Sequence, residues 1–467
     1  MNINSLKTFI EKTWDTSVIP SLKRYITIPA VSPAFNPDWN TTSHLLDTLE
    51  LAQSWCKSMA LENTNIQIIK EEGRTPILLI QIEATTPDHN ENILMYGHLD
   101  KQPPATGWDD NKGAWTPVIE NDRLYGRGAV DDGYSIFTAV TAIKALQSEN
   151  IPHGRCVILI ETCEESGSWD LEYYIETCKD IIKTPSLIIC LDSGCGDYER
   201  IWITTSLRGT IVGEIEARIL TQDIHSGMSG MVASSFRILR QILDRVEDSK
   251  TGDILIKDFY TQIPPERLTQ MKETAKIIDT HLILDLPLFD DTSTMSNDPL
   301  QLLINSTWKP AISYIGAEGI PKFETAGNVI REYSKLLLSI RTPPTVDTTM
   351  PSQKLKSVIE QDPPYGAKVT YNLLKHASGW DMPQLGHLLE ENINNASNLC
   401  FGKTCGFAGE GGSIPFMTLL AKNFPDAKFL ITGALGPNAN AHGANEFLHL
   451  PYVKKLNLAI SIIIGNL

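Results

Sequence analysis

The sequence predicts an α/β protein with a central, mostly parallel sheet flanked by helices, and an inserted α+β domain. Before Leu207, short apolar runs alternate with helical patterns, which is typical of parallel strands joined by helical crossovers. After Leu207 the strand patterns alternate as half-exposed strands do, and α/β character returns after Gly379. We therefore expect 1–206 and 380–467 to form one domain, interrupted by 207–379.

Apolar spacing predicts the elements of the first domain in order. Helical spacing predicts helices at 4–27, 43–60, 133–147 and 169–182. Apolar runs predict strands at 66–69, 77–82, 93–96, 156–160 and 187–191. Near the end of the chain, a strand at 428–432 precedes a loop rich in glycine and asparagine, and a helix at 450–463 closes the domain.

The insertion has the outline β-α-β-β-α-β, the split βαβ arrangement. Strands are expected at 209–218, 333–341 and 367–374, with helices at 231–246 and 351–360. The region 250–308 contains Pro264 and Pro265 and a polar run at 290–298, so it is expected to hold loops and helices.

Composition limits the function classes. The net charge is −16, which argues against nucleic-acid binding and against binding to an anionic membrane. Eight cysteines form no Cys-x-x-Cys pair, and a chain of 467 residues needs no disulfide framework. The first residues lack the pattern of a signal peptide, and the apolar stretch 456–464 is too short to cross a membrane. We expect a cytoplasmic protein.

The segment Glu161-Thr-Cys-Glu-Glu-Ser-Gly-Ser168 follows the predicted strand 156–160. Glu164 and Glu165 would therefore lie at the carboxyl end of that strand, where open α/β sheets bind ligands. Two adjacent carboxylates repel each other and lose hydration there, and a metal ion would offset both costs. A solvated acidic loop is the commoner origin of an isolated Glu-Glu pair, so the other strand ends decide between the two interpretations.

Further metal-ligand types follow other predicted strands. His98 and Asp100 are two residues apart, so their side chains share a face, and Asp100 can orient the imidazole. Asp131 and Asp132 precede the helix at 133–147 and could instead cap it. Asp192, after the strand 187–191, could instead be an ordinary aspartate at the start of a loop. His442 lies in the glycine- and asparagine-rich loop after the strand 428–432, where a core histidine is a poor alternative.

Together these residues supply imidazole and carboxylate ligands without a thiolate. Such ligands suit Zn²⁺ or Mn²⁺. There are enough of them for two divalent ions that share one bridging carboxylate, as in many hydrolytic sites.

An ordered set of motifs resembles the co-catalytic metallopeptidase family that includes carboxypeptidase G, aminoacylase and the carnosinases, and within it the cytosolic nonspecific dipeptidase branch. The resemblance covers nearly the whole chain. Its motifs are Gly97-His-Leu-Asp100, Gln102-Pro-Pro104, Gly107-Trp108, Leu124 to Asp132, Glu164 to Ser168, Ile224-His-Ser-Gly227, Glu410 to Pro415, Asn440-Ala-His442 and Asn445-Glu446.

The resemblance implies a set of roles. Asp131 would bridge the ions. His98 and Asp192 would complete the protein ligands of one ion, and Glu165 and His442 those of the other. Glu164 would be the general base that activates a water bridging the ions, and the Asp131–Asp132 peptide bond would be cis. The implied reaction is hydrolysis of short peptides, most simply dipeptides with a free C-terminal carboxylate.

The same resemblance assigns residues to the substrate. His225 would stabilise the oxyanion from a partner subunit, so the inserted domain would act as a lid and dimerisation domain. The other three positions resemble those that hold the carboxylate and backbone of the substrate: Asn328, Arg341 and Ser413. Arg341 is the most persuasive physically, because a guanidinium matches a carboxylate with two hydrogen bonds.

The chain departs from the branch at several positions, which puts a strict carnosinase-like preference in doubt: Lys101, segment 109–114, Gly133 and Tyr134, Asn328 and Gly409. An N-acyl-amino-acid deacylase of the same family is one alternative. A non-catalytic homologue that binds metal or a small molecule is another. A serine or cysteine hydrolase is disfavoured, because no Gly-x-Ser-x-Gly motif is present and Cys163 lies beside acidic residues that raise a thiol pKa.

Overall fold

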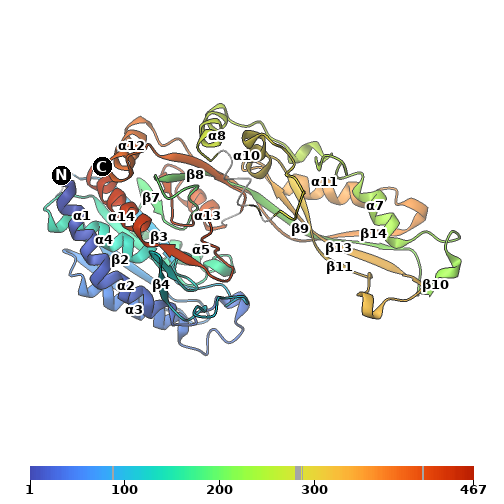
Figure 1. The fold of residues 1–467 in the computed structure, drawn as a ribbon, viewed down its shortest axis with the longest axis horizontal. Coiled ribbons are helices and arrows are strands. Elements are labelled where there is room, and N and C mark those ends of the chain that lie inside the picture. The colour runs from blue at the N-terminus through green and yellow to red at the C-terminus, as the bar shows by residue number, and fades with distance from the viewer. Residues whose placement is uncertain (87–88, 279–285, 287, 413–414) are drawn as a thin grey trace. The chain divides into compact units, whose positions relative to one another are not determined.

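The computed structural model describes residues 1–86, 89–278, 286, 288–412 and 415–467. The chain divides into two compact units (Figure 1). The first unit contains 1–204, 382–408 and 415–467, and the second contains 205–381 and 409–414. No described helix has both the length and the apolar composition needed to span a lipid bilayer.

The first unit is built around a six-stranded sheet with the order β1-β2-β6-β3-β7-β17. Its strands are β1 (Thr64–Ile69), β2 (Ile77–Ile82), β3 (Asn92–His98), β6 (Arg155–Glu161), β7 (Leu187–Cys190) and β17 (Lys428–Ile431). The four neighbours β6, β3, β7 and β17 are parallel, whereas β2 is antiparallel to both of its neighbours. The sheet is thus mixed, with the expected parallel core.

Helices cover both faces of this sheet. They are α1 (Ile3–Thr13), α2 (Ile19–Ile26), α3 (His44–Ser58), α4 (Ser135–Ser148), α5 (Leu171–Thr177), α6 (Lys179–Ile182), α12 (His387–Phe401), α13 (Pro415–Asn423) and α14 (Leu450–Gly465). Gly97 faces α4, because a Cβ there would lie 2.2 Å from the hydroxyl oxygen of Ser135. Its neighbour Tyr96 therefore points to the other face, where it stacks on Phe416 of α13 at 4.0 Å between ring centroids.

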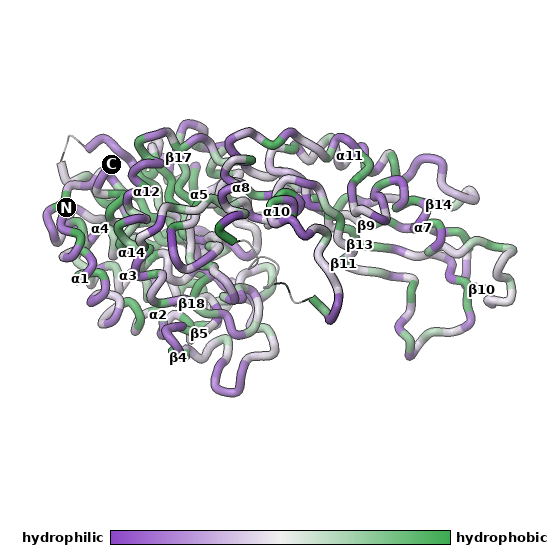
Figure 2. The backbone as a smooth tube through the Cα atoms, turned by 45° about the horizontal axis from the view of Figure 1, so that its top comes forward, coloured by the Kyte–Doolittle hydropathy of each residue, from purple (hydrophilic) through white to green (hydrophobic). Residues whose placement is uncertain are grey.

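The first helix expected from the sequence is divided in the structure. A π-helical segment (Trp14–Val18) connects α1 to α2, and Trp14 on it is fully buried. The expected helix at 169–182 is likewise two helices, α5 and α6, which meet at Cys178. Hydrophobic residues run along α14 and the central strands, and they form the core of this unit (Figure 2).

A small three-stranded sheet positions the loops that hold Asp131 and His442. It has the order β18-β5-β4, formed by β4 (Val118–Glu120), β5 (Arg123–Tyr125) and β18 (Phe447–His449). β5 leads directly into the loop that holds Asp131, and β18 follows the loop that holds His442. Pairing of β5 with β18 therefore brings together two loops that are distant in sequence.

The second unit has a four-stranded antiparallel sheet with the order β11-β13-β9-β14. Its strands are β9 (Gly209–Arg218), β11 (Ala311–Glu318), β13 (Tyr333–Thr342) and β14 (Lys368–Ala377). Sequence reasoning did not locate β11, the edge strand that completes the β-α-β-β-α-β outline. Other elements of this part of the chain are α7 (Ser235–Leu243), α8 (Pro265–Ile278), α10 (Pro299–Thr307), α11 (Thr349–Glu360), β10 (Ile224–His225), β12 (Val329–Ile330) and β15 (Trp380–Asp381).

Burial in the second unit explains its patterned sequence. Helices α7 and α11 pack on one face of the sheet, and β9 and β13 place alternate residues in the core they share. Helices α8 and α10 pack on each other around Met271, Leu303 and Trp308. The chain passes between the units at four places: within β8 (Trp202–Leu207), after Asp381, within β16 (Gly406–Glu410) and directly before α13.

Candidate metal centre

Imidazole and carboxylate side chains gather at the carboxyl end of the four parallel strands. His98 is the last residue of β3, Glu164 and Glu165 follow β6, Asp192 follows β7, and His442 lies in the long loop after β17. The carboxyl ends of parallel strands meet at one edge, which is why ligands from distant segments converge there.

The ligand atoms form two groups. His98, Glu164 and Asp192 make one group, and Asp131, Glu165 and His442 make the other; within each, one ligand atom per residue lies within 4.8 Å of the others. Asp131 connects the two groups. Its Oδ1 lies 3.2 Å from His98 Nε2, and its Oδ2 lies 2.9 Å from His442 Nε2.

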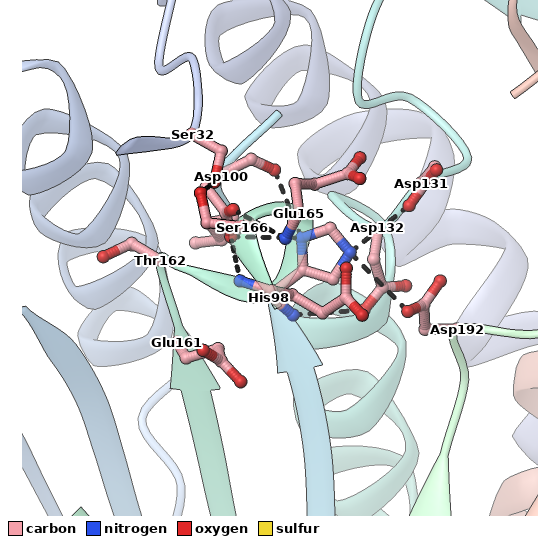
Figure 3. Close-up of polar contacts among 12 residues, drawn as sticks. Ser32, His98, Asp100, Asp131, Asp132, Glu161, Thr162, Glu165, Ser166 and Asp192 are labelled. Carbon is pink, nitrogen blue, oxygen red and sulfur yellow. Dashed lines mark hydrogen bonds and ion pairs between the residues drawn. The ribbon is translucent and has the colours of Figure 1, made fainter. Parts of the chain in front are cut away.

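His98 presents Nε2 to this cluster. Its Nδ1 is 3.2 Å from the carbonyl oxygen and 3.3 Å from a carboxylate oxygen of Asp100. Figure 3 shows Asp100 on one side of the imidazole, with Asp131 and Asp192 on the other. A hydrogen bond at Nδ1 leaves the lone pair of Nε2 directed at the cluster, which is the arrangement typical of a metal-ligating histidine.

Asp100 also fixes the turn that carries the two glutamates. Its Oδ1 accepts the backbone N–H of Glu164 at 3.1 Å, and its Oδ2 accepts that of Glu165 at 3.0 Å. The turn is the 3₁₀ segment η3 (Glu164–Ser166), and Ser166 anchors its far end by hydrogen bonds with Ser32 and with the backbone N–H of Ala34 (Figure 3). One buried carboxylate therefore sets the positions of His98, Glu164 and Glu165 together.

Buried carboxyl groups crowd the centre. Burial raises the pKa of Glu164, and nearby Asp192, Asp100 and Asp131 raise it further. Burial likewise raises the pKa of Glu165, and it raises that of Asp192 to about 7. These groups would be costly as anions in an empty low-dielectric site, so a cation is the expected counter-charge.

The two histidines and Asp131 are tightly linked. Burial alone would lower the pKa of His98, but the nearby carboxylates of Asp100, Asp131 and Asp192 outweigh it and raise that pKa. The hydrogen bond with Asp131 raises the pKa of His442, even though burial opposes the change. Burial would raise the pKa of Asp131, yet the two histidines lower it. Protons therefore take positions here that a cation would displace.

The donor set fits divalent metal ions. Among the described residues, Nε2 of fully buried His98 has no hydrogen-bond partner, although carboxylate oxygens surround it. The surrounding atoms are imidazole nitrogens and carboxylate oxygens, which suit Zn²⁺ or Mn²⁺. Neither Asp131 nor Asp132 caps α4, whose N-cap residue Tyr134 makes no side-chain cap bond. The capping alternative for these two aspartates is therefore wrong.

The Asp131–Asp132 peptide bond is cis, as the sequence resemblance implied. The chain turns there so that Asp131 faces the histidines, while Asp132 Oδ2 accepts the backbone N–H of His98 at 3.2 Å. Burial raises the pKa of Asp132 well above its ordinary value. Asp132 thus supports the end of β3.

Residues assigned to the substrate lie in the second unit or outside the described chain. His225 and Asn328 are exposed and adjacent there, because the Ser226 N–H donates to the Asn328 carbonyl oxygen at 2.9 Å. Arg341 is half-buried on β13 opposite Thr210 of β9, and burial lowers its pKa. Ser413 lies outside the described residues. These four assignments stay predictions.

Lys101, a departure from the branch pattern, is buried in the fold. Its ammonium group donates to the carbonyl oxygens of Tyr25 and Ile28, each at 2.8 Å, at the C-terminal end of α2. This lysine links the strand end bearing Asp100 to α2. Sequence reasoning left it as a possible specificity residue, because only the fold reveals its partners.

Comparisons with known proteins place this centre in a family. The profile of Peptidase family M20/M25/M40 matches residues 94–464, which is most of the chain. The chain belongs to this peptidase family. Two similar solved structures share the fold: the dipeptidase Dug1p from Saccharomyces cerevisiae (TM-score 0.77, 21% identity, 100% of this chain and 98% of that chain) and human carnosine dipeptidase 1 (0.75, 19%, 100% and 99%).

Two curated relatives cover most of the chain. The cysteinylglycine-S-conjugate dipeptidase of Corynebacterium striatum is 26% identical over 86% of both chains. The Cys-Gly metallodipeptidase dug1 of Schizosaccharomyces pombe is 25% identical over 96% of this chain and 95% of its own length. A more distant structure, a dinuclear metal-binding peptidase of the M20 family from Bacillus subtilis, has a TM-score of 0.57 at 11% identity. The protein is therefore a metallopeptidase of this family.

Proposed function

We propose that this protein hydrolyses dipeptides with a free C-terminal carboxylate and that two divalent cations, Zn²⁺ or Mn²⁺, are its cofactors. The observation that carries the proposal is the pair of ligand groups joined by Asp131, one of which also contains Glu164. The dipeptidase names of relatives that match nearly end to end support the choice of substrate.

Each side chain of the centre has a role in this proposal. Asp131 would hold both cations, together with His98 and Asp192 for one and with Glu165 and His442 for the other. The bound cations would polarise the scissile carbonyl and lower the pKa of a water molecule. Asp100 orients His98 and holds the backbone of Glu164 and Glu165 by the hydrogen bonds already described.

Glu164 is the proposed general base. Its carboxylate takes a proton from the attacking water and returns it to the leaving amine nitrogen, so one group serves both proton transfers. Burial and its acidic neighbours raise its pKa, which makes the carboxylate a stronger base than an exposed glutamate. Its backbone is fixed by Asp100, which holds the carboxylate close to the ligand groups.

The second unit supplies the substrate contacts in this proposal. Arg341 and Asn328, with Ser413, would hold the C-terminal carboxylate and backbone of the dipeptide, and His225 would donate to the oxyanion. Arg341 keeps its charge despite its lowered pKa, because an arginine remains protonated at any physiological pH.

We also propose that two copies associate through the second unit and that His225 acts on the site of the partner. Exposed apolar side chains in this unit support an interface: Phe323 (98% exposed), Met231, Ile315 and Leu374. Phe323→Glu should shift the mass measured by light scattering from dimer to monomer and reduce activity. A wild-type monomer that is fully active would contradict this part of the proposal.

A cytoplasmic location is part of the same proposal. All eight cysteines are free thiols, and seven of them are buried. Free thiols that serve as small apolar core residues are typical of a reducing compartment.

Hydrolysis assays test the function directly. Metal-free protein reloaded with Zn²⁺ or Mn²⁺ should cleave a panel of dipeptides, and Glu164→Gln should lower kcat by about 10²–10⁴-fold. Glu172→Gln, an exposed glutamate on α5, is the matched control and should retain activity. Cleavage confined to N-acyl-amino acids would instead identify a deacylase. Metal binding with hydrolysis of neither panel would indicate a non-catalytic homologue.

A further inference from the structure

A buried ion pair lies behind one of the two ligand groups, and the proposed chemistry does not use it. Arg127 and Glu446 have side chains that are 1% and 0% exposed, and Arg127 Nη1 donates to Glu446 Oε2 at 2.6 Å. The two residues are 319 positions apart in the chain. Arg127 follows β5, and Glu446 directly precedes β18, so the pairing of these strands brings them together.

Two further hydrogen bonds of this ion pair reach the segments that carry His442 and Asp131, two ligands of the same group. Arg127 Nη2 donates at 2.9 Å to the carbonyl oxygen of Gly443, the residue after His442. Glu446 Oε1 accepts at 3.3 Å the N–H of Val130, the residue before Asp131. The hydrogen bond from Val130 is buried, where water does not compete for it, and the one to Gly443 is partly buried.

The third ligand of the group is reached through a neighbouring residue. Arg127 Nε donates at 3.0 Å to the carbonyl oxygen of Pro103. The preceding residue, Gln102, donates its side-chain amide to Glu165 Oε2 at 2.5 Å. All three ligands of this group, Asp131, Glu165 and His442, therefore depend on segments that the guanidinium and its partner carboxylate hold.

The loop of His442 needs such a restraint. Four of its residues other than glycine adopt positive φ, a costly conformation for them. They are Asn438, Asn440, His442 and Asn445, with φ between 53° and 63°. His442 is also the most exposed ligand, because 56% of its side chain is accessible. Without the Arg127 contact to Gly443, the loop would sample conformations in which His442 turns away from Asp131.

The other ligand group is held by different contacts. Asp100 positions His98 and the backbone of Glu164, as described above. We propose that the Arg127–Glu446 ion pair is a positioning clamp for one metal ion, the one bound by Asp131, Glu165 and His442. Weakening the clamp then converts a protein that binds two ions tightly into one that retains only the ion at His98 and Asp192. This inference rests on the two-ion site of the proposed function.

The test is metal stoichiometry, which does not depend on substrate. Wild-type protein, Arg127→Lys and Glu446→Gln are freed of metal, titrated with Zn²⁺ by calorimetry, and analysed for bound zinc after dialysis. Wild-type protein should bind two ions per chain. The variants should bind one ion as wild type does and the other about 10–100-fold more weakly, the usual effect of removing a residue that orients metal ligands.

A matched control distinguishes the loss of the clamp from the general effect of replacing a buried arginine. Arg155, at the start of β6, is also buried and donates to Asn92 and to the Ile181 carbonyl oxygen. Arg155→Lys should bind two ions with wild-type dissociation constants. If the single variants at the clamp fail to fold, Arg127→Met with Glu446→Leu removes both charges together and should still lose one ion selectively.

Two results with the variants would overturn the clamp, and so would one with wild type. One is that the clamp variants bind both ions as wild type does, and the other is that they lose both ions to the same extent. A wild type that binds a single ion would overturn it as well. If instead wild type binds two ions, the variants bind one, and no dipeptide is cleaved, then the proposed function fails while the clamp stands.

Discussion

Glu161 is a buried carboxyl group beneath the metal centre, and it should control the stability of the metal-free protein as pH changes. It ends β6 and is 1% exposed. Its Oε1 accepts from the Tyr96 hydroxyl at 2.5 Å and from the Ser168 hydroxyl at 2.8 Å. Among the described residues Oε2 has no hydrogen-bond partner, and burial raises the pKa of Glu161 from 4.5 to about 7.

The sign and size of the effect follow from this shift. Between the unfolded pKa of 4.5 and the folded pKa of about 7, folded protein holds a proton that unfolded protein releases. The free energy of unfolding therefore falls as pH rises through this window and levels off above it. A shift of that size corresponds to about 3 kcal/mol, of which about 2.5 kcal/mol is lost between about pH 5 and about pH 8.

Glu161→Gln removes this titration. The amide of the variant does not titrate, so its effect on the free energy of unfolding should be roughly the same at every pH. Among the described residues, Oε2 of the native side chain already lacks a hydrogen-bond partner, so the substitution removes no hydrogen bond at that atom. The free energy of unfolding of the variant, relative to that of wild type, should therefore rise by about 2.5 kcal/mol between about pH 5 and about pH 8. Urea unfolding in the presence of a chelator, followed by tryptophan fluorescence and circular dichroism at several pH values, measures this difference.

The exposed residue Glu50 on α3 provides a matched control, Glu50→Gln, whose pH dependence should follow wild type. A difference between Glu161→Gln and wild type that stays the same at every pH would refute the reasoning. It would mean that Glu161 keeps an ordinary pKa despite its burial.

Three further outcomes test other parts of the structure. Lys101→Met should lower the free energy of unfolding, measured by chemical denaturation, by about 2–4 kcal/mol, because buried carbonyl groups lose their hydrogen-bond donor. The control is Lys144→Met, which removes an exposed hydrogen bond and should change the free energy of unfolding little. Zn²⁺ binding near pH 7 should release protons, because the pKa of Asp192 is raised to about 7. Calorimetry in two buffers of different ionisation enthalpy should show fewer protons released near pH 9 than near pH 7, and equal release at the two pH values would contradict this. Arg341→Lys should raise the KM for dipeptides by about tenfold or more without affecting substrates that have an amidated C-terminus, and an equal effect on both would exclude carboxylate binding.

The ligands of the metal centre could be predicted because the chemistry is local in sequence. Most candidates end or follow an apolar strand of the parallel sheet, and parallel strands bring their carboxyl ends to one edge; Asp131 instead lies between β5 and α4. His98, Asp131, Glu165, Asp192 and His442 do meet at that edge. Their roles as ligands, and those of the substrate residues, stay predictions that the proposed assays test.

Other features had no local signal. β11 was missed because its residues are largely exposed at the edge of a sheet, so they lack the alternation that marks a half-buried strand. The central sheet is mixed because β2 pairs antiparallel with β6, and strand direction is set by the connections between elements rather than by the residues of a strand.

The sequence by itself determined the α/β class and the residue types of the centre, because periodicity and strand-end motifs depend on neighbouring residues. Only the tertiary structure decided how those residues are held. Asp100 links the turn at Glu164 to β3, and Arg127 contacts Glu446 across most of the chain. Such contacts are absent from any local pattern, because their free energy arises only when folding buries both partners together.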